Sequence, residues 1–303
     1  MSEVAVRNLN KHFRRHHVLK NLSFSFGAGE IVGFVGPNGS GKSTTMKCIA
    51  NLVFPDKNSS IQVGGYDLFK NRNQALSQLS ALIETPGLYY NLSGMDNLKL
   101  FAKLRGITKQ RLDEVIEFSG LGPALKKKAS DYSMGMKQRL ALAIAVLPSP
   151  AFLILDEPFN GLDPQGVFDL REVIKGLAKK GCGILFSSHQ LLEMEKIASR
   201  NVFIRAGEIV SQEQAQSEAA VLSYRLILKR EDRDLEFLSN LKQASILEGF
   251  EADEHELVFT LTDSKYCAEV LAALLSNGRE LKGIMPVTAN IENLYNSIYK
   301  PGA

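Results

Sequence analysis

The alternation of apolar and polar positions divides the first 210 residues into short strands and longer helices. Three short apolar runs, at residues 31–35, 152–155 and 184–186, are bounded by glycine, proline or polar residues, which is typical of strands buried on both faces. Helical patterns separate these runs along the chain. Strands and helices that alternate in this way predict an α/β fold, in which helices cover a parallel sheet.

The segment between residues 86 and 147 has a different pattern. Leu98, Phe101 and Ala102 recur at helical spacing, and Gly106 follows them as a helix stop. We therefore expect a helical subdomain that is inserted into the α/β core.

A polar stretch at residues 211–222, SQEQAQSEAAVL, shows no strand alternation and is the candidate linker. It separates a predicted first domain, residues 1–215, from a predicted second domain, residues 216–303. Beyond the linker, strand alternation returns at Tyr224 and again at Leu257, with helical stripes between and after the two runs. The second domain is therefore predicted to be small and α+β.

The composition excludes some classes of protein but does not indicate a function. An apolar fraction of 45% is ordinary for a globular protein, and a net charge of +3 neither indicates nor excludes a nucleic-acid partner. The three cysteines lie far apart without a CxxC pair, so neither a disulfide framework nor a zinc site is expected. The chain contains no apolar run of bilayer length and no signal-peptide core at its N-terminus. We expect a protein of the reducing cytoplasm that does not itself cross a membrane.

A phosphate-binding motif follows the first apolar run. The sequence GPNGSGKST at residues 36–44 matches G-x-x-x-x-G-K-[ST], and a helical pattern comes after it. Its glycines let backbone N–H groups surround phosphate oxygens, and the helix N-terminus adds partial positive charge. In this motif the lysine reaches the β- and γ-phosphates and the serine offers its hydroxyl to Mg²⁺. A glycine-rich turn without a ligand is the alternative. The residues expected to contact the nucleotide are Gly36, Asn38, Gly39, Ser40, Gly41, Lys42, Ser43 and Thr44.

Two adjacent carboxylates, Asp156 and Glu157, end the apolar run at residues 152–155. Burying ionised groups is costly unless a cation or a set of donors compensates them. A Mg-nucleotide at the phosphate motif would supply the positive charge, because Asp156 could then hold Mg²⁺ through its water shell. Glu157 could orient or deprotonate the attacking water. Taken alone, such a pair is more often a helix N-cap, but the phosphate motif favours the catalytic interpretation.

The stretch YSMGMKQRLALAIAVL, which starts at Tyr132, resembles the signature of the ATP-binding cassette (ABC) ATPases, whose usual form is LSGGQ. Ser133 and Gly135 are kept, whereas Met134 and Met136 replace the first glycine and the glutamine. A serine hydroxyl and a glycine backbone at a helix start form an anion site. Read in isolation, the segment is an ordinary capped core helix.

The order of the other motifs supports the resemblance. Residues 161–163, GLD, resemble the D-loop of the family, and His189, after a strand, resembles its switch histidine. Phe13 matches the aromatic residue that stacks on adenine in the family, with core packing as the alternative. The resemblance covers residues 1 to about 210.

Membership of this family implies a P-loop NTPase with a RecA-like core, an antiparallel β subdomain and a helical signature subdomain. Lys42, Glu157 and His189 would take part in the hydrolysis of ATP with Mg²⁺. The signature residues Ser133 and Gly135 of one subunit would complete the phosphate site of a second copy, so a head-to-tail dimer is expected. The dimer would work with a separate transmembrane permease at the cytoplasmic face of the cell membrane.

One position departs from the common pattern. In ALIETPGLYYNLSGMDNL, Glu84 stands where most of the family has a glutamine that senses Mg²⁺, a variant similar to the ATPases of bacitracin and lantibiotic self-protection exporters. A glutamate keeps an oxygen for Mg²⁺ but loses the amide donor. We expect Glu84 to be a Mg²⁺ ligand, with a solvent-bonded loop residue as the alternative. Residues 86–90 are expected either to dock a permease helix or to pack in the helical subdomain.

The function expected from the resemblance is the ATPase subunit of an exporter of a peptide antibiotic, a drug or a lipid-like substrate. A soluble ABC ATPase that acts on nucleic acid or ribosomes is the alternative. Members of that kind carry a long coiled coil or two cassettes, whereas only about ninety residues separate the two motifs here, without sustained heptads. No nucleic-acid partner is therefore expected. A small-molecule kinase would leave the signature and His189 unexplained.

The second domain resembles an accessory domain of exporter ATPases, which could tune dimer closure, bind a ligand or stabilise the dimer.

Overall fold

The computed structural model describes residues 2–84, 87–210, 222–228, 231–253, 255–275 and 282–287, together with positions 291, 295, 298 and 299. The chain divides into two compact units, Met1–Ser211 and Gln212–Ala303. The predicted linker lies outside the described residues except for Leu222.

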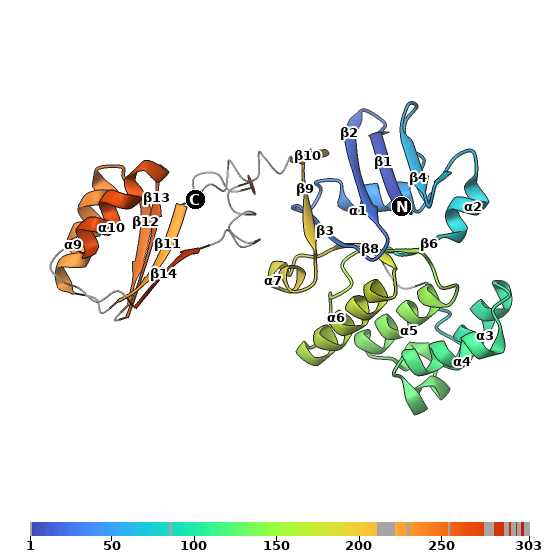
Figure 1. The fold of residues 1–303 in the computed structure, drawn as a ribbon. Coiled ribbons are helices and arrows are strands. Elements are labelled where there is room, and N and C mark those ends of the chain that lie inside the picture. The colour runs from blue at the N-terminus through green and yellow to red at the C-terminus, as the bar shows by residue number, and fades with distance from the viewer. Residues whose placement is uncertain are drawn as a thin grey trace. The chain divides into compact units, whose positions relative to one another are not determined.

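An antiparallel sheet forms the first layer of the first unit, shown in blue in Figure 1. Its strands run in the order β2-β1-β4-β5, and the pairs β1–β2, β1–β4 and β4–β5 are all antiparallel. The strands are β1 (Glu3–Phe13), β2 (His16–Gly27), β4 (Ser60–Val63) and β5 (Tyr66–Asp67). This sheet is the antiparallel subdomain that the family resemblance implies, and β1 ends at Phe13.

The central sheet has six strands in the order β10-β9-β3-β8-β7-β6, and it is parallel except for β10. The strands are β3 (Ile31–Val35), β6 (Leu79–Leu82), β7 (Phe152–Leu155), β8 (Gly183–Ser187), β9 (Arg200–Arg205) and β10 (Glu208–Val210). Every residue of β3, β7 and β8 is buried, as the three apolar runs predict. Because β3, β8 and β7 are parallel neighbours, the segments that follow them meet at one edge of the sheet.

Helices cover the central sheet. The helix α1 packs its buried side chains Met46, Cys48 and Ile49 into the core between the two sheets, whereas α5 (Met134–Val146) and α6 lie on the opposite side (Figure 1). These helices and their smaller neighbours are α1 (Lys42–Ile49), α2 (Arg72–Ser77), α6 (Pro164–Lys179) and α7 (Leu191–Glu195). None of the described helices of the protein is both long and apolar enough to cross a membrane.

The helical subdomain is inserted between β6 and β7, as the sequence predicts. It contains α3 (Gly94–Leu104), α4 (Lys109–Phe118), α5 (Met134–Val146) and two short 3₁₀ helices, Gly122–Lys126 and Ala129–Asp131. Each of these α-helices is preceded by a hydroxyl N-cap residue whose side chain accepts a backbone N–H bond, namely Ser93, Thr108 and Ser133. Such N-caps satisfy donors that a helix start leaves unpaired.

The second unit is a separate α+β body. Its antiparallel sheet has the order β12-β13-β11-β14. Among the described residues its elements are β11 (Leu222–Ile227), α9 (Asp232–Gln243), β12 (Leu247–Ala252), β13 (Glu256–Leu261), a 3₁₀ turn (Ser264–Tyr266), α10 (Cys267–Leu275) and β14 (Gly283–Val287). The element order and the sheet order are those of the split βαββαβ motif. Leu226, Leu257 and Phe259 belong to a core that this unit forms by itself.

Candidate nucleotide site

The phosphate loop connects β3 to α1, as its motif requires. Gly39 and Gly41 have positive φ angles of 78° and 113°, which glycine adopts without strain. A Cβ atom at Gly36 would lie 2.5 Å from the carbonyl oxygen of Ile204. The N-cap residue of α1 is Gly41, which has no side chain to cap the helix, so the first N–H groups of α1 can serve a bound anion.

Lys42, the first residue of α1, is only 6% exposed. Its Nζ donates to the carbonyl oxygens of Gly36 at 2.5 Å and of Pro37 at 3.1 Å. The ammonium group therefore lies inside the phosphate loop and is bonded to its backbone. Burial lowers the pKa of Lys42, and the carboxylates of Glu157 and Asp156 oppose that shift. The lysine thus belongs to the same electrostatic site as the two carboxylates.

Ser40 supplies an independent sign of a ligand. Its hydroxyl is buried and has no hydrogen-bond partner among the described residues. Buried polar groups in native proteins are nearly always bonded. A phosphate oxygen in the loop would provide the missing partner.

The two carboxylates follow β7, and Ser187 at the end of β8 joins them. The Ser187 hydroxyl donates to Asp156 Oδ1 at 2.7 Å and accepts the Glu157 backbone N–H at 2.9 Å. Glu157 has a φ of 52°, an uncommon backbone conformation for a residue with a Cβ atom. Sequence reasoning did not identify Ser187, although a serine that ends an apolar strand beside a site is a usable signal.

His189 contacts Glu157 twice. Its backbone N–H donates to Glu157 Oε2 at 3.1 Å, and its Nε2 lies 3.1 Å from Oε1, although these two atoms are not aligned for a hydrogen bond. Burial raises the pKa of the Glu157 carboxyl, while His189 and Lys42 pull it down and Asp156 pushes it further up. The arrangement gives a shielded carboxylate that is held beside a histidine, as a group that orients or deprotonates water requires.

Phe13 lies at the end of β1 and is 47% exposed, which excludes the core-packing alternative. The Nζ of Lys11 lies 5.0 Å from the centre of its ring. The stacking of this ring on adenine stays a prediction.

Glu84 forms an ion pair that the sequence did not predict. Its Oε1 lies 2.5 Å from the Nζ of Lys47 on α1, one helical turn beyond Ser43. The carboxylate is therefore held at the phosphate helix rather than bonded to solvent alone, although the side chain is 63% exposed. Its role as a Mg²⁺ ligand stays a prediction.

The signature segment begins α5. Ser133 is the N-cap, and its hydroxyl accepts the Met136 N–H at 3.3 Å. The half-exposed Met134 packs against the D-loop, because a Cβ atom at Gly161 would come within 2.9 Å of its side chain. Ser133 is exposed, so it is accessible to a ligand on a second copy.

The sequence of this chain is similar to those of known proteins. The family model described as ABC transporter matches residues 19–160. The chain is 33% identical to the bacitracin transport ATP-binding protein BcrA of Enterococcus faecalis over 310 aligned positions, which cover 99% of this chain and 97% of the relative. It is 38% identical to the lantibiotic transport ATP-binding protein SrtF of Streptococcus pyogenes, covering 68% of this chain and 88% of the relative.

Solved structures are similar as well. The ATP-binding subunit of an ABC transporter has a TM-score of 0.65 and 31% identity, covering 72% of this chain and 93% of the other. A dimeric ATP-binding cassette bound to ADP and phosphate shares the fold, with a TM-score of 0.62 and 22% identity over 69% of this chain and 97% of the other. These relatives do not support the alternative of an ABC ATPase that acts on nucleic acid. The chain belongs to the ABC transporter family, as an ATP-binding subunit that hydrolyses ATP.

Proposed function

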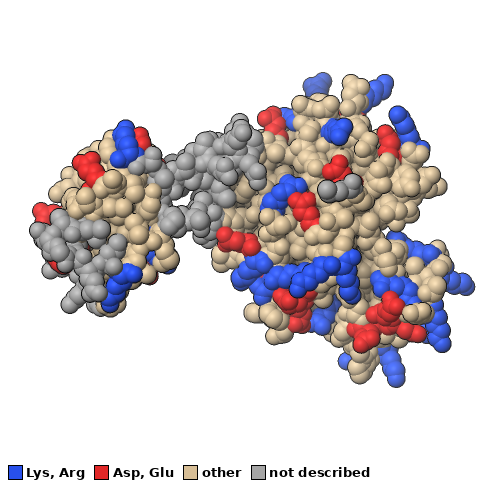
Figure 2. All heavy atoms as spheres, viewed as in Figure 1, with Lys and Arg blue, Asp and Glu red and all other residues tan. Residues whose placement is uncertain are grey.

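We propose that this chain powers the export of a peptide antibiotic through a separate permease. The supporting observation is that the similarity to a bacitracin transport ATP-binding protein extends over 99% of the chain, through both units. A drug or a lipid-like molecule is the wider class of cargo. On the face of the first unit that Figure 2 shows, acidic and basic side chains both occur, a mixture that does not favour a nucleic-acid partner there.

In the proposed mechanism the triphosphate lies in the loop between β3 and α1, and Lys42 contacts its terminal phosphates. Glu157 orients the attacking water and takes up its proton, while the water oxygen bonds to the terminal phosphorus, the bond from that phosphorus to the bridging oxygen breaks, and ADP leaves. His189 holds the Glu157 carboxylate in place through the contacts at both of its oxygens.

Mg²⁺ would be held by Ser43 and Asp156, with Glu84 as a further ligand. The donor set fits, because hydroxyl and carboxylate oxygens together with phosphates suit this cation. Ser187 engages only Oδ1 of Asp156 among the described contacts, which leaves the second carboxylate oxygen for the cation's water shell. When bound, Mg²⁺ neutralises charge on the phosphates.

The catalytic unit is proposed to be a head-to-tail dimer at the cytoplasmic face of the membrane. Ser133 and Gly135 of one copy would contact the nucleotide that is held by the other copy. The start of α5 suits this role, because backbone N–H groups and a hydroxyl meet there.

The permease is proposed to dock at residues 86–90, of which Pro86 lies outside the described residues, and its contact is expected near Tyr89 and Tyr90. Both rings are exposed, whereas Leu88 beside them is buried. Asn97 fixes the Tyr89 backbone by donating to its carbonyl at 3.0 Å and accepting its N–H at 2.9 Å. The Nζ of Lys137, on the signature helix, lies 5.7 Å from the centre of the Tyr90 ring, so a partner at this surface would contact a residue joined to α5.

The test is to isolate the membrane protein that copurifies with this chain and to express the two together in a bacitracin-sensitive bacterium. We expect tolerance to bacitracin or to a lantibiotic to rise with the wild-type chain and with the surface variant Asp113→Ala, but not with Glu157→Gln. Equal tolerance with the wild type and Glu157→Gln would refute ATP-driven export of these peptides.

A further inference from the structure

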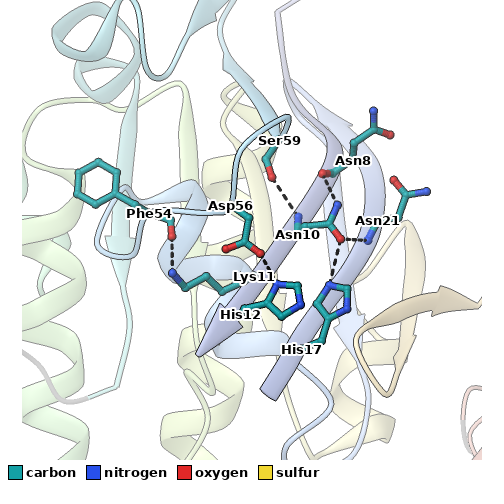
Figure 3. A network of polar contacts seen from close by, with 9 residues as sticks. All are labelled: Asn8, Asn10, Lys11, His12, His17, Asn21, Phe54, Asp56 and Ser59. Carbon is teal, nitrogen blue, oxygen red and sulfur yellow. Dashed lines mark hydrogen bonds and ion pairs between the residues drawn. The ribbon is translucent and has the colours of Figure 1, made fainter. Parts of the chain in front are cut away.

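A polar network joins the tip of the β1–β2 hairpin to the loop that follows α1 (Figure 3). The hairpin tip carries Phe13. The loop, residues 50–59, continues directly from the helix whose first residue is Lys42. The network therefore connects the proposed adenine platform to the phosphate helix.

Two side chains of β1 reach across to this loop. Lys11 Nζ donates to the carbonyl oxygen of Phe54 at 2.7 Å, and His12 Nδ1 lies 2.6 Å from Asp56 Oδ2. The hydrogen bond from His12 lowers the pKa of the Asp56 carboxyl, so the carboxylate is ionised at neutral pH. The two residues that make these contacts, Lys11 and His12, directly precede Phe13 in β1.

The rest of the network holds these two residues in place. The His12 ring stacks on that of His17 across the hairpin, with centres 3.8 Å apart, and His17 Nε2 lies 3.1 Å from Asn10 Oδ1. The Asn10 carbonyl accepts the Asp56 N–H at 2.8 Å, and the Asn10 N–H donates to Ser59 Oγ at 3.1 Å. The loop is thus bonded to the hairpin at several points by both backbone and side chains.

Lys11 has a second contact, because its Nζ lies over the ring of Phe13, 5.0 Å from the centre. One ammonium therefore touches both the aromatic ring and the loop that follows the phosphate helix. A cation over an aromatic face stabilises the ring in one orientation. Phe13 is still 47% exposed, so part of its surface is accessible to a base.

We propose that Lys11, His12 and Asp56 are positioning residues for ATP, which hold the Phe13 ring in a fixed orientation relative to the helix that follows the phosphate loop. The proposal rests on the proposed role of Phe13 as the adenine platform. Preorganisation of an exposed ring raises affinity, because binding then does not have to immobilise it. Exposed ion pairs add little to folding stability, so the effect of this network is expected in nucleotide binding.

The test compares the binding of MgATP with that of magnesium tripolyphosphate, which has no base, by titration calorimetry on the full chain. Phe13→Ala is expected to lose about tenfold in ATP affinity, from the usual strength of base stacking on an aromatic ring. Lys11→Met and Asp56→Ala are expected to lose about three- to tenfold for ATP and less than about twofold for tripolyphosphate, because they act through the same stacking.

Two charge-removing variants serve as controls, and a double-mutant cycle tests whether Asp56 acts through Phe13. Lys57→Met and Asp113→Ala remove the same charges from exposed positions and should bind both ligands as the wild type does. Asp56→Ala should have no further effect in a Phe13→Ala background, because residues that act through one contact are not additive. Asp56→Asn, which keeps an oxygen acceptor, should retain more ATP affinity than Asp56→Ala.

The outcomes distinguish a failure of the adenine role of Phe13 from a failure of the positioning role of Lys11 and Asp56. If Phe13→Ala binds ATP normally, the adenine role of Phe13 fails and the positioning role fails with it. If Phe13→Ala weakens ATP binding while Lys11→Met and Asp56→Ala do not, only the positioning role is overturned. An equal loss for ATP and tripolyphosphate in Asp56→Ala would also overturn it, because the network would then act on the phosphate loop.

Discussion

At the scale of single residues, Glu157 combines the properties that a water-orienting carboxylate needs. It follows a buried strand, its backbone N–H is bonded to the Ser187 hydroxyl, and its carboxylate contacts His189. Its positive φ sets the direction in which the side chain leaves the strand end. Such a backbone conformation is unfavourable, and it is often found at active sites.

Replacing Glu157 with Gln keeps the size and hydrogen-bonding reach of the side chain but removes its capacity to take up a proton. We expect ATP affinity to stay within about twofold and kcat to fall by about 10²- to 10⁴-fold, the usual contribution of a general base. Calorimetric titration and a phosphate-release assay measure the two quantities. Turnover at the wild-type rate would remove Glu157 from this role.

At the scale of elements, two helix starts and one loop organise the site. The N-cap residue of α1, Gly41, has no side chain to cap the helix, so the N–H groups at its start are proposed to face the nucleotide, whereas α5 is capped by Ser133. Lys47 connects α1 to the loop after β6 through Glu84. The two helices therefore position the proposed ligand groups. Substitutions at the contacts near the helix ends are expected to change nucleotide binding and turnover.

Ser133 has a structural role as N-cap and a proposed role toward the second copy, and Ser133→Gly separates them. Glycine at an N-cap costs only a few tenths of a kcal/mol, whereas alanine costs about 1 kcal/mol. We expect Ser133→Gly to unfold at nearly the wild-type temperature yet to lose ATP-driven association. Light scattering in the Glu157→Gln background measures this association. Normal association of Ser133→Gly would show that its hydroxyl is not needed between copies.

Glu84 and Lys47 are expected to affect the Mg²⁺ requirement in opposite directions. Glu84→Gln removes a negative charge and should raise the Mg²⁺ concentration for half-maximal ATPase activity. Lys47→Met frees the carboxylate from its partner and should lower that concentration. The measurement is a Mg²⁺ titration of ATPase activity at saturating ATP. Identical curves for the two variants and the wild type would leave Glu84 without a role at the metal.

At the scale of the whole molecule, the proposed nucleotide site belongs to the first unit. Lys42, Asp156, Glu157 and His189 all follow strands of its central sheet. The second unit has its own sheet and its own core. We propose that residues 216–303 are an accessory domain that acts on dimer assembly rather than on nucleotide binding.

Removing residues 216–303 should therefore leave a folded ATPase. We expect the affinity for MgATP to stay within about twofold, because each domain of such a chain can fold alone. Dimerisation and ATPase rate report on the accessory role. If neither changes, the second unit has no role in assembly or turnover, and a loss of ATP binding would contradict the division between the units.

Local patterns were enough to predict part of this structure. The strands Ile31–Val35 and Phe152–Leu155 match the predicted bounds, because apolar runs with polar residues at both ends leave little freedom in placing a buried strand. The β1–β2 hairpin followed only from the family resemblance. Register shifts within the pair interrupt the two-residue alternation that would have revealed it.

Contacts between distant residues could not be predicted. Lys47 and Glu84 are 37 positions apart, and His12 and Asp56 are 44 apart. No pattern within one element signals such a pair, because the partners meet only after the sheets have formed. The phosphate motif could be identified because its chemistry requires neighbouring residues.

The most direct test of the account is the mass of the Glu157→Gln chain in solution, measured by light scattering with and without MgATP. We expect the Glu157→Gln chain to be a monomer without MgATP and a dimer with it. A Lys42→Ala chain, which should bind ATP weakly, is the control and is expected to stay monomeric. A Glu157→Gln chain that binds MgATP yet stays monomeric, both alone and with its permease, would contradict the account.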